Sequence, residues 1–555
     1  MTHHPSTPGS YDPASVAGKQ PPVPDETDLL IVGAGPAGLA AARAAADRGI
    51  RVTLVDENPV PLDTMAEEVP LHFGNRMSGI AASYNNMLEA VLDARPELVD
   101  LLEAGVEVRL GTSVWGLFPR HPGAAWIDGA VAGLADAQHT SLLRFRQAIV
   151  AAGRRDMGLA FEGWSLPGVM GASAAWRLAT LYGALDAKRV VLVGGETESL
   201  LVAQALRARG VEIVAVVEQA STIPGVPELV TSLREAGTAC LTGHIVRRAR
   251  GDASGVTSVE IVKLDAQGQP DDSTLRVFAC DTVMLGIAAL PSIELLEAAG
   301  CRTTFSMARG GHIADVDDAQ RTSLPGVLAA GDCTGVWSSK SLDERIARRE
   351  GERAAATALQ ALGVAGSASV SSAPDAIDLP DTSPRDIAAA RVAWVQASVV
   401  AASGTPFVCQ CEEVTAREIL DVQPPRYLGW HAADEHHDTR GVAGLATDGP
   451  PNPDTVKRLT RACMGPCQGR RCREQVAALL AIGSACALPE IPLATFRAPV
   501  RPLSLQRLAE VEEAPSLAAH WDSWFGMAPQ WVPFWRVEPL YRATTREHGG
   551  PVSSE

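Results

Sequence analysis

Residues 28–58 constrain the fold more than any other part of the chain. They read DLLIVGAGPAGLAAARAAADRGIRVTLVDEN. An apolar strand runs into Gly33-x-Gly35-x-x-Gly38, an alanine-rich helix follows, and a second strand ends at Asp56. This order is typical of a dinucleotide-binding βαβ unit. Its first glycine allows a tight turn, its second lets a pyrophosphate approach the backbone, and its third lets the helix pack closely on the strand.

The same unit supplies the first set of predicted cofactor contacts. The helix N-terminus faces the phosphates, so we expect Pro36 and Ala37 to join the three glycines at the cofactor. Asp56 stands where a carboxylate accepts hydrogen bonds from a ribose hydroxyl. Glu57 is the alternative residue for that role.

Residues 189–219 repeat the pattern as RVVLVGGETESLLVAQALRARGVEIVAVVEQ. Gly194 holds the first glycine position, but Glu196 and Ser199 occupy the second and third. A carboxylate repels a pyrophosphate, and a Cβ blocks its approach to the backbone. The sequence therefore predicts a second Rossmann unit and argues against NAD(P) binding to it. Glu218, if used, would favour NADH over NADPH.

Two further segments complete a flavoprotein pattern. A strand ends at Gly331-Asp332, and Gly153 follows a strand in QAIVAAGRRD. The Gly-Asp pair resembles the second flavin fingerprint of proteins with two dinucleotide-binding domains, in which the Asp binds the ribityl chain. The resemblance implies FAD and an α/β fold of the glutathione-reductase-like type. Residues 28–362 contain only four separated cysteines, which disfavours disulfide reductase chemistry.

The chain divides into six predicted parts. They are a disordered N-terminal segment (1–27), a discontinuous FAD domain (28–156 and 310–362), the second Rossmann domain (157–309), a linker with a helix (363–405), a small helical cysteine domain (406–485) and a tryptophan-rich C-terminal arm (486–555). The arm is expected to pack on the chain's own flavin domain or on a partner.

The cysteine domain carries a clustered set of thiols. Cys409-x-Cys411 and Cys467-x4-Cys472 offer two pairs. Four cysteines suit an iron–sulfur cluster or zinc, and the spacing differs from the repeated CxxC of common zinc ribbons. Each pair lies at the start of a helix, Thr415 can cap the first of these, and Gly465 and Gly469 keep the second loop close to sulfur. We expect an iron–sulfur cluster, with zinc and free thiols as alternatives.

This arrangement resembles the bacterioferritin-associated-ferredoxin-like [2Fe-2S] domain. The gap between the two pairs is longer than that family leads us to expect, so residues 421–453 are interpreted as an inserted loop. Its histidines are expected to be solvated, and Cys463 is not expected to be a ligand because four other thiolates already complete a site. Basic residues crowd residues 457–473, where they either support an anionic cluster, hold a phosphate or acidic partner, or form a solvated helix face.

Together these features resemble the α-type subunits of heteromeric amino-acid and amine dehydrogenases. Relatives include hydrogen cyanide synthase, octopine and nopaline oxidase, D-hydroxyproline dehydrogenase and heterotetrameric sarcosine oxidase. The most specific parts are VCQCEEVT and KRLTRACMGPCQGRRC. The resemblance implies a β-type flavoprotein subunit that oxidises the C–N bond, with electrons relayed through FAD and [2Fe-2S] here. It also allows an FMN at an interface within the complex, and a small additional subunit.

Two other functions stay open from the sequence. One is a self-contained NAD(P)H-dependent flavoprotein reductase that passes electrons to its own cluster. The other is a non-enzymatic iron or redox adaptor, against which two flavin fingerprints argue. No Ser-His-Asp or paired-carboxylate constellation stands out, so no catalytic residue is assigned, and the acceptor is unspecified. The segment expected to line the isoalloxazine is HFGNRMS at residues 72–78, which lacks the expected glycine-rich pattern.

Charge and hydropathy narrow the setting. Lys and Arg number 48 against 65 Asp and Glu, giving a net charge of −17. Such an acidic chain is a poor candidate for nucleic acid. No apolar run reaches the roughly 20 residues that a transmembrane helix needs, and the N-terminus lacks a signal-peptide pattern. We therefore expect a cytoplasmic protein.

Overall fold

The computed structural model describes residues 23–60, 76–120, 129–364, 385–402, 404–426 and 440–509. Several predictions concern residues outside these ranges. They are the N-terminal lead-in up to residue 22, most of the segment expected to line the isoalloxazine, the loop histidines His431, His436 and His437, and the tryptophan-rich stretch of the C-terminal arm.

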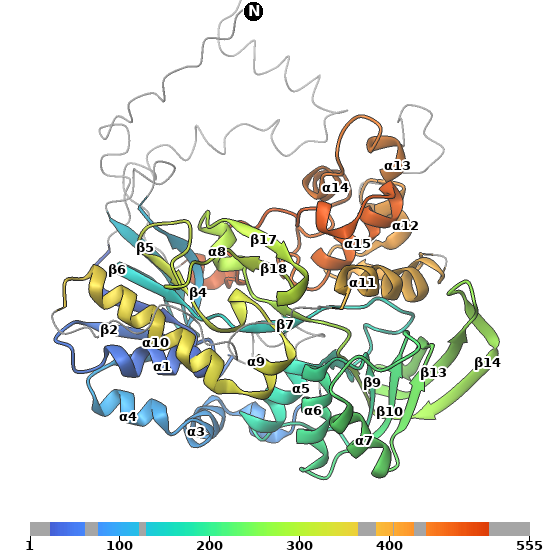
Figure 1. The fold of residues 1–555 in the computed structure, drawn as a ribbon, viewed down its shortest axis with the longest axis horizontal. Coiled ribbons are helices and arrows are strands. Elements are labelled where there is room, and N and C mark those ends of the chain that lie inside the picture. Colours follow the sequence, from blue (N-terminus) through green and yellow to red (C-terminus); the bar gives the residue numbers. More distant parts are fainter. Residues whose placement is uncertain are drawn as a thin grey trace, which may run out of the picture.

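A seven-stranded sheet forms the first domain, at the left of Figure 1. Its order is β3-β2-β1-β6-β5-β4, and β19 pairs with β6. The central strand β1 is apolar from Leu29 to Val32 and buried there, as expected for a strand covered on both faces. The strands are β1 (Asp25–Val32), β2 (Val52–Val55), β3 (Glu107–Arg109), β4 (Ser113–Phe118), β5 (Ala130–Ala135), β6 (Thr140–Val150) and β19 (Val327–Ala329).

The predicted lead-in of residues 1–27 is too long at its end. Strand β1 begins at Asp25, and Thr27 is buried opposite Phe145 of β6. The Thr27 hydroxyl donates a hydrogen bond to the Arg51 carbonyl at 3.0 Å. The first three residues of this strand, Asp25 to Thr27, are polar, so an apolar run does not mark its start.

Helices cover one face of this sheet. α1 (Pro36–Ala45) and the long α10 (Glu344–Ala361) pack side by side, although about 300 residues separate them. Gly351 makes the close approach possible, because a Cβ there would overlap the Ala37 carbonyl. The smaller helices at this side are η2 (Gly79–Ala82), α3 (Tyr84–Ala94) and α4 (Glu97–Glu103).

A five-stranded parallel sheet forms the second domain, with order β11-β10-β9-β15-β8. A three-stranded antiparallel sheet projects beside it, at the far right of Figure 1. The elements are β8 (Val169–Gly171), α5 (Ala172–Thr180), β9 (Arg189–Val193), α6 (Thr197–Arg207), β10 (Glu212–Glu218), α7 (Pro227–Glu235), β11 (Ala239–Thr242), β12 (His244–Asp252), β13 (Gly255–Leu264), β14 (Pro270–Ala279) and β15 (Thr282–Leu285).

Two chain crossings join these domains. β7 (Arg154–Asp156) leaves the first sheet and pairs with β16 (Ala289–Pro291), which returns from the second. The return path then runs to β19 and the Gly331-Asp332 turn through α8 (Glu294–Ala298), β17 (Thr303–Ser306), η4 (Met307–Arg309) and β18 (Gly311–Ala314). The Gly331-Asp332 turn opens η5 (Gly331–Thr334), and α9 (Ser338–Leu342) follows.

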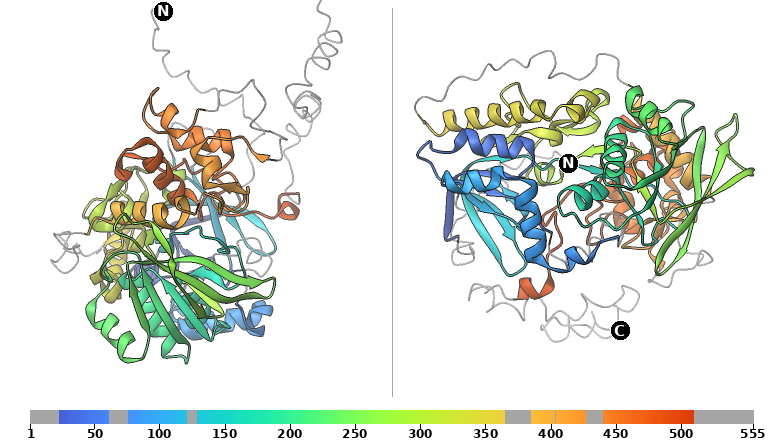
Figure 2. Two further views of the ribbon diagram at one scale, coloured as in Figure 1. Left: turned by 90° about the vertical axis from the view of Figure 1, so that its right-hand side faces the viewer. Right: turned by 90° about the horizontal axis from the view of Figure 1, so that it is seen from below.

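A small helical domain sits above the second sheet in Figure 1 and at the top of the left view in Figure 2. It comprises α11 (Ile387–Val395) with a π-helical turn (Gln396–Val400), β20 (Phe407–Cys409), β21 (Val414–Thr415), α12 (Ala416–Leu420), α13 (Val442–Leu445), α14 (Pro453–Thr460) and α15 (Arg473–Ser484). Beyond η9 (Leu488–Glu490) the chain returns to the first sheet, where the Val500 N–H donates to the Trp115 carbonyl at 2.8 Å. The short α16 (Leu505–Ala509) follows.

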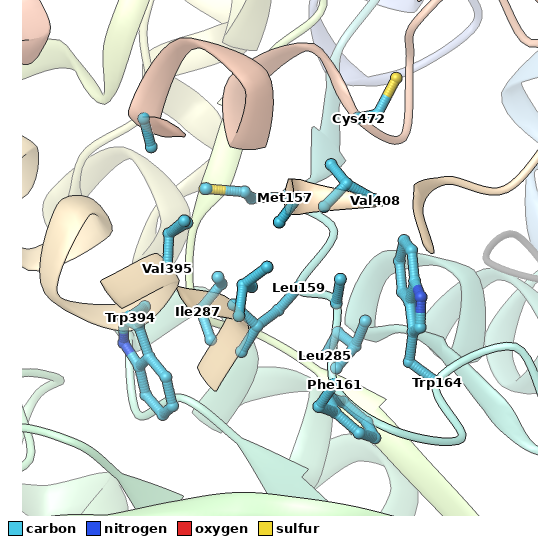
Figure 3. Close-up of a cluster of buried hydrophobic side chains, with 14 of the residues drawn as sticks. Met157, Leu159, Phe161, Trp164, Leu285, Ile287, Trp394, Val395, Val408 and Cys472 are labelled. Carbon is cyan, nitrogen blue, oxygen red and sulfur yellow. The ribbon is translucent and has the colours of Figure 1, made fainter. Parts of the chain in front are cut away.

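One continuous apolar core fixes the helical domain to the second sheet (Figure 3). Leu159 and Phe161 follow β7, Leu285 ends β15, and Trp394 and Cys472 come from the helical domain. All five are buried, so separating the two domains would expose this core to water. In the described part of the chain, no helix is long and apolar enough to cross a membrane.

Candidate functional site

The glycine loop of the first domain has the features that a dinucleotide requires. Gly33 has φ +104°, and Cβ atoms at Gly33 and Gly38 would collide with the carbonyls of Ala151 and Gly33 respectively. A Cβ at Gly35 would meet nothing within 4 Å. Two glycines therefore serve the protein's own packing, whereas Gly35 leaves open space at the start of α1.

The two acids after β2 have different partners. Asp56 Oδ2 accepts a hydrogen bond from the Ala34 N–H at 2.6 Å, and Oδ1 accepts from the Asn58 backbone and side-chain amides, both at 2.8 Å. Glu57 instead pairs with Arg501 of the C-terminal segment at 2.9 Å. Burial acts to raise the pKa of Glu57, but the positive charges of Arg501, Arg177 and Arg470 outweigh it and hold that pKa well below its usual range.

The Gly331-Asp332 turn lies against the glycine loop. Gly331 has φ +78°, and a Cβ there would stand 3.0 Å from Ala37 Cβ. A buried ion pair holds this turn in place. Lys340 Nζ lies 2.8 Å from Glu350 Oε2 and also donates a hydrogen bond to the Gly331 carbonyl. Asp332 keeps about a quarter of its side chain exposed and faces Arg154 at 3.6 Å.

These parts line two adjoining cavities of about 130 and 490 Å³. The smaller lies beside Asp56 and Glu57, and the larger contains Asp332 and Lys340. Both are bordered by Gly35 and by the predicted cofactor residue Gly153, together with Ala151, Arg95 and Arg177.

This cleft fits FAD. Arg95 Nη1 is buried with no hydrogen-bond partner among the described residues, and Asp56 is 3.8 Å away. An unsatisfied buried guanidinium donor beside an open glycine loop suits an anionic phosphate. The two cavities adjoin at Gly35 and Gly153, with the acids that follow β2 beside one and the Gly331-Asp332 turn beside the other, which matches the order of parts in a dinucleotide.

The glycine loop of the second domain borders the larger cavity with Glu196 and Ser199 in place of two glycines. Glu196 forms an ion pair with Arg385, which comes from the start of the linker helix region. Burial raises the pKa of Glu196 to about 7, against the opposing charge of Arg385. Ser199 is accommodated because Gly286 faces it, and Glu218 accepts a hydrogen bond from the Gly195 N–H at 3.1 Å. A pyrophosphate would have to displace Arg385 and approach a carboxylate.

The four predicted thiols come together in the helical domain. Cys409 and Cys411 sulfurs are 3.9 Å apart, and Cys411 and Cys467 sulfurs are 3.7 Å apart. Cys472 is buried in the same group. As expected, Thr415 caps α12 through a capping box with Glu418. A Cβ at Gly465 would lie 3.0 Å from Cys411 Cβ and closer still to its sulfur.

The surroundings of these sulfurs fit an anionic cluster. The hydrogen bond with Cys409, together with burial, raises the pKa of the Cys411 thiol to about 11, so neighbouring thiolates need a positive metal to be stable. Gln410 Nε2 and Arg473 Nε and Nη1 are buried with no hydrogen-bond partner among the described residues. Arg461 and Gln468 have positive φ angles, a conformation that can turn backbone N–H groups toward an anion.

The basic segment is only in part a solvated helix face. Arg470, Arg471 and Arg473 are buried, whereas Arg458 is exposed. No set of three or more His, Cys, Asp or Glu side chains in the described ranges could hold a metal ion as it stands. Four thiols grouped in this way suit an iron–sulfur cluster or zinc.

Arg155 joins the cleft to the thiol domain. It donates to Glu294 at 2.6 Å, to Glu474 of α15 at 2.5 Å and to the Arg470 carbonyl at 2.9 Å. Gln475 also accepts a hydrogen bond from the Ala160 N–H at 2.8 Å. No local pattern in the sequence points to these residues, although Arg155 follows the predicted Gly153 by two positions, because the partners lie far apart in the chain.

Comparison with known proteins places the fold. Residues 27–361, more than half of the chain, match the model of the family described as pyridine nucleotide-disulphide oxidoreductase. The chain belongs to this family. Its members are flavoprotein oxidoreductases with the α/β fold seen here, so the flavoprotein fold expected from the sequence is confirmed and FAD is its cofactor.

Two curated relatives are similar to this chain over most of its length. One of the opine oxidase subunits of Agrobacterium tumefaciens (strain Ach5) is 27% identical over 89% of this chain and 93% of its own. Hydrogen cyanide synthase subunit HcnB of Pseudomonas protegens is 26% identical over 80% of this chain and 89% of its own. The similarity to these subunits confirms the resemblance to the α-type subunits of such complexes, whereas the resemblance of the cysteine domain to a ferredoxin-like domain stays a prediction.

One solved structure is similar to more of the chain than the residues that match the family model. The crystal structure of L-proline dehydrogenase from P. horikoshii aligns with a TM-score of 0.56 at 19% identity, covering 87% of this chain and 80% of that one. At this identity the likeness concerns the fold alone.

Proposed function

We propose that this chain is the electron-transfer subunit of a heteromeric flavoprotein dehydrogenase or oxidase. Its complex oxidises the C–N bond of an amino acid or secondary amine, such as an opine, hydroxyproline or sarcosine. A separate β-type flavoprotein subunit carries the substrate site. The names of the relatives, subunits of opine oxidase and hydrogen cyanide synthase, support this proposal.

The junction between the flavin cleft and the thiols carries the proposal. Asp156 lines the larger cavity, and the next residue, Met157, lies in the same core as Cys472 (Figure 3). A small cavity bounded by Asp156, Arg177, Arg470 and Arg471 lies between the two sites. A flavin and a cluster held here would be neighbours, as a relay requires.

Different residues of this chain would bind the two cofactors. Gly33, Gly35, Gly38, Asp56, Gly331 and Asp332 would hold FAD, and Cys409, Cys411, Cys467 and Cys472 would hold a [2Fe-2S] cluster. When bound, the flavin supplies two-electron chemistry and the cluster supplies one-electron transfer. Arg155 fixes the distance between the two sites, and the Glu196–Arg385 pair keeps a nicotinamide dinucleotide out of the second domain.

Anaerobic titration of the purified chain tests the proposal. NADH and NADPH should leave the flavin absorbance unchanged, whereas dithionite should bleach both flavin and cluster. Fast bleaching by NADH at low concentration would instead show a stand-alone reductase. A Cys409→Ala/Cys411→Ala variant serves as a control, because it should lose the cluster absorbance while its flavin still responds to dithionite.

The amine donor is tested with the assembled complex. The chain is co-expressed with a β-type subunit encoded by the same organism, and opines, hydroxyproline and sarcosine are added without oxygen. Reduction of the cluster by one of these amines is expected only when both subunits are present. Reduction by the isolated chain would contradict the division of labour proposed here.

A further inference from the structure

A fifth cysteine belongs to the thiol group. Cys463 Sγ lies 3.6 Å from Cys472 Sγ, and only 1% of the Cys463 residue is exposed. This sulfur pair is as close as the other two, which are 3.9 and 3.7 Å apart. From the sequence, Cys463 is not expected to be a ligand because four other thiolates already complete a site. That count of thiols gives no sign of the contact between Cys463 and Cys472, which lie nine residues apart in the chain.

The separation of the two sulfurs has a chemical meaning. Two thiolates on one tetrahedral metal, each about 2.3 Å from it, lie about 3.8 Å apart. Cys463 and Cys472 therefore already stand at nearly the spacing of two ligands on one metal. The Cys411–Cys467 pair has the same spacing.

The backbone holds Cys463 in an unusual conformation. Its φ is +72°, in the left-handed region that disfavours every residue with a Cβ and that glycine adopts freely. A strained residue of this kind persists only where the surrounding structure holds it, and such positions gather at functional sites. Gly469 makes room beside it, because a Cβ there would lie 3.1 Å from both Cys463 Cβ and Arg473 Cζ.

Arg473 gives the pair a positive neighbour. Its guanidinium is buried over the Phe496 ring at 3.3 Å from the ring centre, and two of its nitrogens have no hydrogen-bond partner among the described residues. Gly469 places this guanidinium and Cys463 on the same side of the loop. A positive charge beside this loop suits an anionic, thiolate-ligated cluster.

We propose that Cys463 is an exchangeable ligand of the [2Fe-2S] site, able to take the place of Cys472. This inference rests on the proposed cluster. In the exchange, the Cys472 sulfur–iron bond breaks and a Cys463 sulfur–iron bond forms. The Cys463 thiol gives up its proton and the released Cys472 thiolate takes one up, so no electron is gained or lost.

The test is cluster assembly in the full-length chain under anaerobic conditions, with ferrous iron, sulfide and dithiothreitol. The variants are Cys463→Ala, Cys472→Ala, the double variant and Cys467→Ala. The readouts are bound iron and sulfide per chain, visible absorbance, and the electron paramagnetic resonance spectrum after dithionite. Bound FAD and the melting temperature report whether each variant folds.

Each outcome bears on the proposal. Cys463→Ala should keep the wild-type spectrum, and Cys472→Ala should keep at least half of the iron with shifted resonance positions. The double variant and Cys467→Ala should each bind less than a tenth of the iron that the wild type binds. If Cys472→Ala loses iron as completely as Cys467→Ala while its FAD domain stays folded, Cys463 is no ligand. If the wild type takes up no cluster, the proposed relay itself fails and the exchange fails with it.

Should Cys472→Ala fold poorly, Cys472→Ser keeps the test decisive. Serine retains the size of the side chain but replaces the soft sulfur that iron prefers. Cys472→Ser should show the shifted spectrum, and Cys463→Ala/Cys472→Ser should lose it. An unchanged spectrum in this double variant would overturn the role of Cys463.

Discussion

Replacing Arg155 with methionine should destabilise the protein strongly. Arg155 has only 9% of its side chain exposed and faces two buried carboxylates, Glu294 with 3% exposed and Glu474 with 11%. Burial alone would lower the pKa of Arg155, but the charges of Glu474 and Glu294 outweigh it and raise that pKa above its usual value. Methionine fills a similar volume, so the change removes charge and hydrogen bonds and leaves the packing largely intact.

The expected loss of stability depends on the charged groups that remain buried after the substitution. Removing one partner of a buried ion pair costs about 3–5 kcal/mol, because the other charge stays buried and uncompensated. Arg155→Met leaves two such carboxylates and the Arg470 carbonyl without their shared donor. We therefore expect the free energy of unfolding to fall by about 4 kcal/mol. Urea unfolding followed by circular dichroism measures it.

Two further variants test whether the buried charges cause this loss of stability. Arg155→Met/Glu294→Met/Glu474→Met should recover most of the loss, because apolar groups of similar volume can replace a buried ion pair at little cost. Arg321→Met is the control: its pair with Asp317 is 53% exposed on both sides, so its loss should stay under about 1 kcal/mol. A loss at Arg155 no larger than this control, or a triple variant as unstable as the single one, would refute the argument.

Three further changes probe the flavin loop, the second domain and the thiol loop. Gly35→Ala should leave the melting temperature unchanged but weaken FAD binding at least tenfold in a fluorescence titration, because its Cβ meets open space where the pyrophosphate would lie. Glu196→Gln should flatten the pH dependence of stability. The pKa of Glu196 is about 7 in the folded protein against 4.5 in the unfolded chain, so the wild-type free energy of unfolding falls as the pH rises from 4.5 to 7. Without this carboxylate, the fall in the free energy of unfolding over that pH range should be smaller by about 1–2 kcal/mol, because a quarter of the side chain is exposed to solvent. Gly465→Ala should lower bound iron at least fivefold, because its Cβ would displace Cys411.

Each of these has a matched control elsewhere in its own domain. Gly79→Ala and Gly449→Ala place a Cβ in open space without a left-handed backbone, so they should preserve FAD affinity and iron content respectively. Glu228→Gln removes an exposed glutamate of α7 and should leave the pH dependence as in the wild type. Equal effects in a variant and its control would show that the named contact is not responsible.

The local units of this protein can be predicted from short segments of its sequence. Both Rossmann patterns, the Gly331-Asp332 turn and the paired thiols lie within short segments, where strand, turn and helix signals follow one another along the chain. The substitutions at Glu196 and Ser199 are equally local. The Thr415 cap could also be predicted, because the hydroxyl and Glu418 are three residues apart.

How these units contact one another depends on the packing of segments that are far apart in the chain. Arg155 meets Glu474 across 319 residues, Arg385 meets Glu196 across 189, and Arg501 reaches Glu57 across 444. The contact between Cys463 and Cys472 depends on a left-handed turn that spacing does not specify. Periodicity and motif spacing report which face of an element is buried, whereas the partner on the other side is fixed by how whole domains pack.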